Sequence, residues 1–310
     1  MLQQEKSPSY VNKSFGFTLG LLGLGFTFML LVSYFSYIAV VSALSIFRVW
    51  LTTDLMVLIN DICIYCLGLP CLLFVGHFLP NGGKLTLTPK KALPTATFAK
   101  FGCIAYALLY FSSLITTFLL AIVRVFMGRS PIDDSLGEML DAMSPLTSFV
   151  LVAILPAILE ELVFRSYLYK KLIRFGELPY IILSGFFFGT YHGNFDQFLY
   201  AFALGCLFAY LVCRTGTPIY GMMLHLLINF YSSNVATQIL GSTVLSSVVS
   251  LAVLVIVGLG CFFFVKIRKT MYVRPSIFLP DHPVLRAISN PGMILWVGAF
   301  LAISVVTLMM

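Results

Sequence analysis

The apolar residues of this chain gather in runs long enough to cross a lipid bilayer, and this constrains the fold more than any other feature. A membrane-spanning helix needs about 20 consecutive, predominantly apolar residues. The 310 residues are 60% hydrophobic and 10% charged, whereas a soluble domain carries about 25% charged residues. The runs are long and continuous, which excludes a β-barrel with its short alternating segments. We therefore expect an all-α, polytopic helical membrane protein.

The apolar runs predict about nine transmembrane helices, of which the fifth is short and either bends or re-enters. The expected spans cover residues 16–44, 53–79, 97–125, 145–169, 179–193, 195–213, 217–238, 244–266 and 290–310. We divide the chain into N-terminal transmembrane helices (1–144), a helical core that holds most of the intramembrane polar residues (145–238), and C-terminal transmembrane helices (239–310).

The distribution of Lys and Arg predicts the orientation, because cytoplasmic loops retain positive charge. With the N-terminus inside, most Lys and Arg residues fall on the cytoplasmic side. The other side then holds Arg48, Arg124 and Arg129 together with Asp54, Asp133, Asp134, Glu138 and Asp141. We predict an N-in, C-out topology. An anionic cytoplasmic leaflet accounts for the net charge of +7, so the lipid bilayer is an expected partner and nucleic acid is not.

A short set of polar side chains falls inside the expected spans. It consists of Asp61, Glu160, Glu161, Arg165, His192, His225 and Asn229. A charged side chain at the centre of a bilayer costs about 2.5–3.5 kcal/mol on insertion scales, and such residues usually mark function. Asp61 has no polar companion on its own span, so we interpret it as structural. The others cluster on three of the later spans.

The first group of these residues is Glu160, Glu161 and Arg165, and their helical spacing predicts which way each side chain points. Glu161 and Arg165 are four residues apart, so they share a helix face and can form an ion pair. Glu160 lies about 100° further round the helix and is free to point elsewhere. A lone Glu–Arg pair in a membrane helix is usually a packing device, but this reading does not explain Glu160.

The other two groups have the same spacing. Phe188 lies four residues before His192 and can wall its pocket, and His225 lies four residues before Asn229. We expect Glu160, His192 and His225 to meet at a similar depth, on the cytoplasmic side of the midplane.

This residue set suits hydrolysis of an amide by activated water. A carboxylate and a histidine can together activate water, while a second histidine and an amide can donate hydrogen bonds to a developing oxyanion. The sequence has neither an HExxH nor a GxSxG motif, and no Ser or Cys has an obvious base beside it. We therefore expect no covalent intermediate.

The three groups resemble the motifs of a known family. Glu160-Glu161-x-x-x-Arg165, Phe188-x-x-x-His192 and His225-x-x-x-Asn229 are similar, in this order, to the EExxxR, FxxxH and HxxxN/D motifs of the CPBP family. That family comprises the type II CAAX prenyl endopeptidases and the bacteriocin-processing and immunity-associated membrane proteins. The resemblance covers roughly residues 145–235.

The resemblance implies an intramembrane glutamic protease whose site opens toward the cytoplasm. Carried over by position, Glu160 and His192 would activate the water, and His225 and Asn229 would hold the oxyanion. Glu161 and Arg165 would orient the site. A stripe of small residues, Ala201, Gly205 and Ala209, would allow close helix packing beside it.

Zinc is the alternative cofactor, because two histidines and a glutamate can bind this metal. The histidines lie on different expected helices without the usual short-spaced pair, and Arg165 would repel a cation. We therefore favour catalysis without a metal or other cofactor.

The functional expectation is a multi-pass endopeptidase of the bacterial plasma membrane that cuts a peptide or membrane-protein substrate near the cytoplasmic face. A non-catalytic immunity or scaffold protein that binds a peptide in the same cavity is an alternative. A proton-coupled transporter with a Glu160–His192 relay is another, although no repeat symmetry or broken helix pair supports it.

Overall fold

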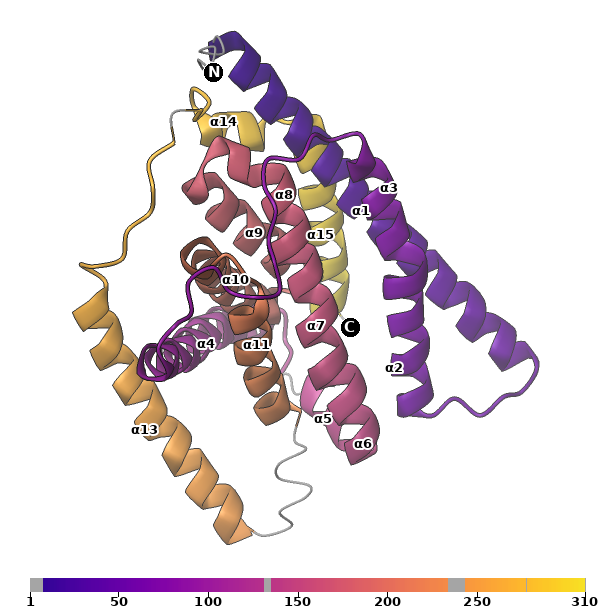
Figure 1. Ribbon diagram of the computed structural model, residues 1–310. Coiled ribbons are helices and arrows are strands. Elements are labelled where there is room, and N and C mark those ends of the chain that lie inside the picture. Colours follow the sequence, from indigo (N-terminus) through magenta and orange to yellow (C-terminus); the bar gives the residue numbers. More distant parts are fainter. Residues whose placement is uncertain (1–7, 131–134, 234–242, 277, 310) are drawn as a thin grey trace.

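The computed structural model describes residues 8–130, 135–233, 243–276 and 278–309, and within these ranges the chain is helical without a strand (Figure 1). The predicted all-α class is confirmed. Asp133, Asp134 and residues 234–238 of the seventh expected span lie outside the described residues.

Helices occupy all nine expected spans. The simple helices are α1 (Pro8–Ile46), α4 (Thr95–Phe126), α9 (Glu177–Tyr191), α10 (Phe195–Thr215), α11 (Ile219–Ser232), α13 (Thr243–Ile267) and α15 (Pro291–Met309). Short helices α5 (Ser135–Asp141) and α14 (Pro283–Ile288) lie between them.

Two spans are composite helices in which α-helical and π-helical segments alternate. The second span consists of α2 (Thr53–Ile62), a π-helical segment (Cys63–Gly68) and α3 (Leu69–His77). The fourth consists of α6 (Pro145–Thr147), a π-helical segment (Ser148–Ile154), α7 (Leu155–Glu161), a second π-helical segment (Leu162–Tyr167), α8 (Leu168–Leu172) and a 3₁₀ turn (Ile173–Phe175). In each, a proline follows closely after a π-helical segment. Proline has no N–H to donate to the carbonyl four residues earlier, so the regular α-helical hydrogen bonding is interrupted in the turn before it.

Seven of the described helices are long and apolar enough to cross a membrane, so the multi-pass fold is confirmed. Helices α9 and α11 have only 15 and 14 residues. At about 1.5 Å per residue they reach about 21–22 Å, less than the roughly 30 Å of a bilayer core. The total of nine crossings therefore stays a prediction.

Helices α9 and α10 pack closely against one another, and glycine permits this. A Cβ on Gly205 would lie 2.7 Å from the Cα of Gly185 in α9, so neither position accommodates a side chain. Ala201 and Ala209, on the same face of α10 as Gly205, are fully buried. The predicted small-residue packing face is thus present.

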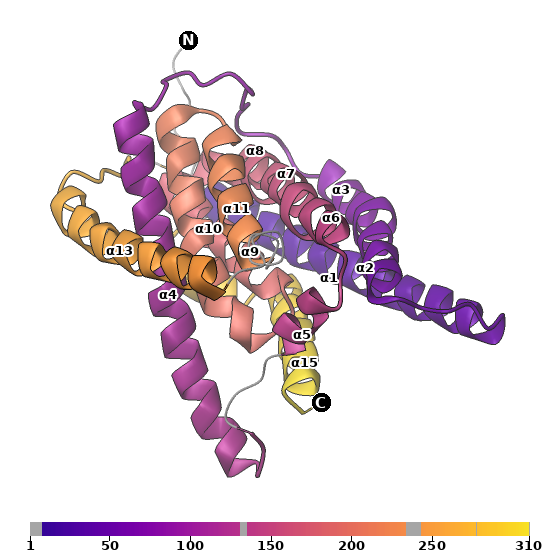
Figure 2. The same cartoon turned by 90° about the horizontal axis from the view of Figure 1, so that it is seen from below.

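The two ends of the bundle differ in charge. At one end, which we call the basic end, residues 78–94 fold back over the helix termini: Lys90 donates its backbone N–H to Thr215 (2.8 Å), and the Gly82 N–H bonds the Lys170 carbonyl. At the opposite end, the acidic end, Arg124 pairs with Asp196 (2.9 Å) and Asp54 accepts the Ser144 N–H (3.0 Å). Figure 2, seen from below, shows α5 and the C-terminal end of α4 at this end.

The basic end is expected in the cytoplasm, because the positive-inside bias sets orientation. Reporter proteins fused after Lys91 or Lys171 should report a cytoplasmic location, and a reporter fused after Asp134 should report the opposite side. The measurement is activity of a compartment-specific reporter at each fusion point. The reverse pattern would overturn the N-in topology.

Candidate active site

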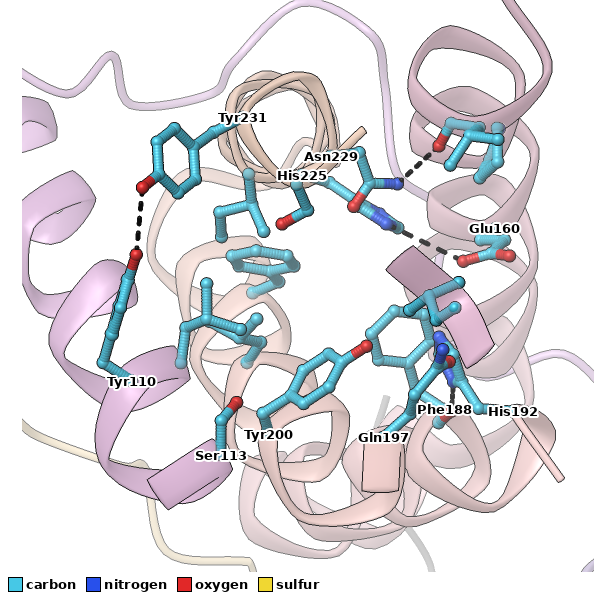
Figure 3. Close-up of a pocket in the computed structure, with 18 of the residues that line it drawn as sticks. Tyr110, Ser113, Glu160, Phe188, His192, Gln197, Tyr200, His225, Asn229 and Tyr231 are labelled. Atoms are coloured by element: carbon cyan, nitrogen blue, oxygen red, sulfur yellow. Dashed lines mark hydrogen bonds and ion pairs between the residues drawn. The ribbon is translucent and has the colours of Figure 1, made fainter. Parts of the chain in front are cut away.

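A cavity of about 430 Å³ lies within the bundle (Figure 3). Its walls come from α4, α5, α10, α11, the composite helix of the fourth span and the C-terminal end of α9. Its polar lining residues are Tyr110, Ser113, Glu160, His192, Gln197, Tyr200, His225, Asn229, Tyr231 and Ser232. The structure therefore brings Glu160, His192, His225 and Asn229 together in one cavity, while Glu161 and Arg165 lie buried behind it.

The cavity lies between the middle of the bundle and the acidic end. Leu136 and Leu140 of α5 line it, and His192 immediately follows the last residue of α9. The expected common depth of Glu160, His192 and His225 agrees with this cavity, because α9 is short and its C-terminal end stops inside the bundle at the depth of Glu160. The placement of these groups on the cytoplasmic side of the midplane stays a prediction.

A chain of paired groups runs from Arg165 to Glu160. The Arg165 Nε lies 3.1 Å from Glu161 Oε2, which is the ion pair expected from the spacing. Glu161 Oε1 lies 3.1 Å from His225 Nδ1, and His225 Nε2 lies 3.8 Å from Glu160 Oε2. A carboxylate only accepts hydrogen bonds, so His225 Nδ1 carries a proton and Nε2 is directed at Glu160. His225 therefore stands between two carboxylates.

Aromatic rings and a glycine enclose the Arg165–Glu161 pair. Both residues are fully buried, and the guanidinium lies 4.3 Å from the ring centroid of Phe188 and 5.2 Å from that of Phe208. A Cβ on Gly221 of α11 would lie 2.6 Å from Glu161 Oε2. This glycine leaves the space that the carboxylate occupies.

A carbonyl of its own helix orients His192. Its Nδ1 lies 2.8 Å from the backbone oxygen of Phe188, four residues earlier. Because a carbonyl only accepts, Nδ1 must carry the proton, which leaves Nε2 as an acceptor. The Phe188 ring also lies 5.0 Å from the His192 ring and 5.6 Å from the His225 ring. The expectation that Phe188 walls the imidazole pocket is confirmed.

A proline fixes the Asn229 side chain. Pro156 has no N–H, so the Val152 carbonyl four residues earlier lacks its usual helical donor. The Asn229 Nδ2 donates to this carbonyl at 3.0 Å. An amide nitrogen carries two hydrogens, and the second stays free for another acceptor. The sequence signal for this contact, a proline four residues before Glu160, was missed.

Glu160 is less isolated than the sequence suggested. The Tyr65 hydroxyl lies 3.4 Å from Glu160 Oε1, and Asp61 lies close enough to Glu160 for the two carboxylates to interact electrostatically. Both residues come from the second span, so the interpretation of Asp61 as unaccompanied was wrong. The spacing of Asp61 and Tyr65, four apart on one helix, was the signal available in the sequence.

No group of three or more His, Cys, Asp or Glu side chains arranged to hold a metal ion occurs in the part of the chain that the structure describes. Metal-free catalysis nevertheless stays a prediction, because this arrangement alone does not test it.

The comparison with known families agrees with the motifs. Residues 142–231 match the family model described as type II CAAX prenyl endopeptidase Rce1-like. No curated protein and no solved structure matches the chain. The matched range includes all of the motif residues and leaves out the first three expected spans and the last two.

The Arg165–Glu161 pair should be essential to stability. Arg165→Leu leaves a carboxylate without its cation in a site without water, which typically costs about 3–5 kcal/mol. We expect a large fall in melting temperature in detergent. The double variant Arg165→Leu/Glu161→Leu removes both charges and should be more stable than Arg165→Leu alone. If the two substitutions destabilised additively, the two side chains would not be coupled.

Proposed function

We propose that the protein is an intramembrane endopeptidase that uses water activated by Glu160 and His192, on the premise that residues 142–231 match the family model of the Rce1-like type II CAAX prenyl endopeptidases. The observation that carries the proposal is one cavity in which Glu160, two oriented histidines and an amide converge. The coarser conclusion, a multi-pass membrane protein of a protease family, follows from the family match and the apolar helices.

In the proposed mechanism, Glu160 accepts a proton from a water that His192 Nε2 also binds. The water oxygen forms a bond to the substrate carbonyl carbon, and the carbonyl oxygen takes the negative charge. His225 Nε2–H and the free Asn229 N–H donate to that oxygen. The C–N bond then breaks as Glu160 returns its proton to the leaving amine, which restores the carboxylate.

Glu161 and Arg165 are assigned a positioning role. Glu161 accepts from His225 Nδ1 and so keeps the opposite ring nitrogen directed into the cavity. In this proposal His225 carries a proton on each ring nitrogen, so that Nδ1–H is donated to Glu161 and Nε2–H is directed into the cavity. Arg165 neutralises Glu161, which is otherwise a charge without solvent.

The proposed substrate is an apolar peptide or a membrane-protein segment. Leucine side chains from three helices, Leu109, Leu136 and Leu204, line the cavity beside uncharged polar groups. We propose the bacterial plasma membrane as the location, and a leader peptide, a bacteriocin precursor or a membrane-protein tail as the source of the segment.

Removal of the base tests the mechanism. Glu160→Gln keeps the shape of the side chain but cannot take a proton, so cleavage should fall about 10²–10⁴-fold with little change in melting temperature. Asn229→Ala should lose about 10²–10³-fold for one oxyanion donor. Comparative peptidomics of membranes that carry wild-type or Glu160→Gln protein identifies cleaved peptides, and their turnover is then measured with each purified variant.

The matched control is Glu138→Gln, an isosteric change at an exposed residue of α5, which should cleave at the wild-type rate. Near wild-type cleavage by Glu160→Gln would show that Glu160 is not the base. Peptide binding without cleavage by the wild-type protein would favour the immunity or scaffold alternative.

Metal content tests the zinc-dependent alternative. We expect purified, active protein to contain well under one zinc ion per chain and to keep its activity in chelators, since Arg165 places a positive charge behind the cavity. Elemental analysis and turnover are measured on the same sample. Stoichiometric zinc that is lost in parallel with activity would establish the metalloprotease instead.

A further inference from the structure

The second span contributes two polar side chains to the back of the candidate site. Asp61, near the end of α2, and Tyr65, in the π-helical segment that follows, are four residues apart and face the same way. The Tyr65 hydroxyl lies 3.4 Å from Glu160 Oε1. The cavity side of the same carboxylate is its Oε2, which faces His225. Glu160 is therefore held between two helices from opposite sides.

The direction of the contact between Tyr65 and Glu160 follows from the two groups. A carboxylate only accepts hydrogen bonds, so the Tyr65 hydroxyl donates its single proton to Glu160 Oε1. This contact restricts the rotation of the carboxylate.

Asp61 lies near this contact. The residue is 9% exposed, and its Oδ2 is buried without a hydrogen-bond partner. It interacts electrostatically with Glu160, Tyr65 and Tyr191. An unpartnered buried carboxylate oxygen is costly, so packing alone gives no reason for an aspartate here.

We propose that Tyr65 and Asp61 are positioning residues for Glu160. Tyr65 holds Glu160 Oε1 by its hydrogen bond, so that Oε2 is presented to the water. Asp61 supplies a second carboxylate whose repulsion of Glu160 is relieved when Glu160 takes the water proton, and this favours that step. The inference rests on the proposed function and deepens it. It also extends the working site to a helix outside the family match at residues 142–231.

Three conservative variants test the assignment. Tyr65→Phe removes the hydrogen bond and should lower kcat about 10–100-fold, the range for a hydrogen bond to a charged group, with KM unchanged. Asp61→Asn should also lower kcat without changing KM. The double variant should lose less than the product of the two single losses, because both act through Glu160.

Tyr167→Phe is the matched control. Its hydroxyl donates to the Leu72 carbonyl at 3.3 Å, so it joins the same two spans but does not contact Glu160. It should keep the wild-type kcat while its melting temperature falls about as much as that of Tyr65→Phe.

The inference is overturned if Tyr65→Phe and Asp61→Asn keep kcat and lose only stability, as the control does. That result together with an inactive Glu160→Gln variant would leave the proposed function intact and reject only this inference. A fully active Glu160→Gln variant would reject both.

Discussion

The buried pair of Glu161 and Arg165 determines the arrangement of the site. Two charges without solvent are stable together only where neighbours provide close, oriented contacts. Here Phe188 and Phe208 cover the guanidinium, and Gly221 leaves room for the carboxylate. The remaining carboxylate oxygen then orients His225. Helices α9, α10 and α11 are thereby fixed around one ion pair, and the side chains of Phe188, Phe208 and His225 that contact the pair also line the cavity.

The features that depend on spacing within one helix could be predicted from the sequence. The Glu161–Arg165 pair, the Phe188 wall beside His192 and the small-residue face of α10 all follow from residues three or four positions apart. Apolar run lengths predicted where helices occur, because the bilayer requires about 20 residues per crossing. These properties are local, so one sequence is enough to show them.

The features that depend on contacts between helices could not be predicted in this way. Nothing in the spacing shows that Tyr65 and Asp61 of the second span face Glu160 of the fourth, or that His225 lies between two carboxylates. The position of His192 in the bundle also depends on how far the short helix α9 reaches into it, which a count of helical turns along the sequence does not show.

The short reach of α9 also has a consequence for the lipid around it. Leu178 and Ile182 are exposed on its surface, yet the helix is about 8 Å shorter than the hydrocarbon layer it would need to match. Lipid beside a short hydrophobic segment compresses, at a cost of fractions of a kcal/mol for each ångström. A helix of this length that begins at one membrane surface ends inside the hydrocarbon layer, and His192 follows its last residue. Water for the proposed reaction then has to reach this histidine through the polar cavity and not from a membrane surface.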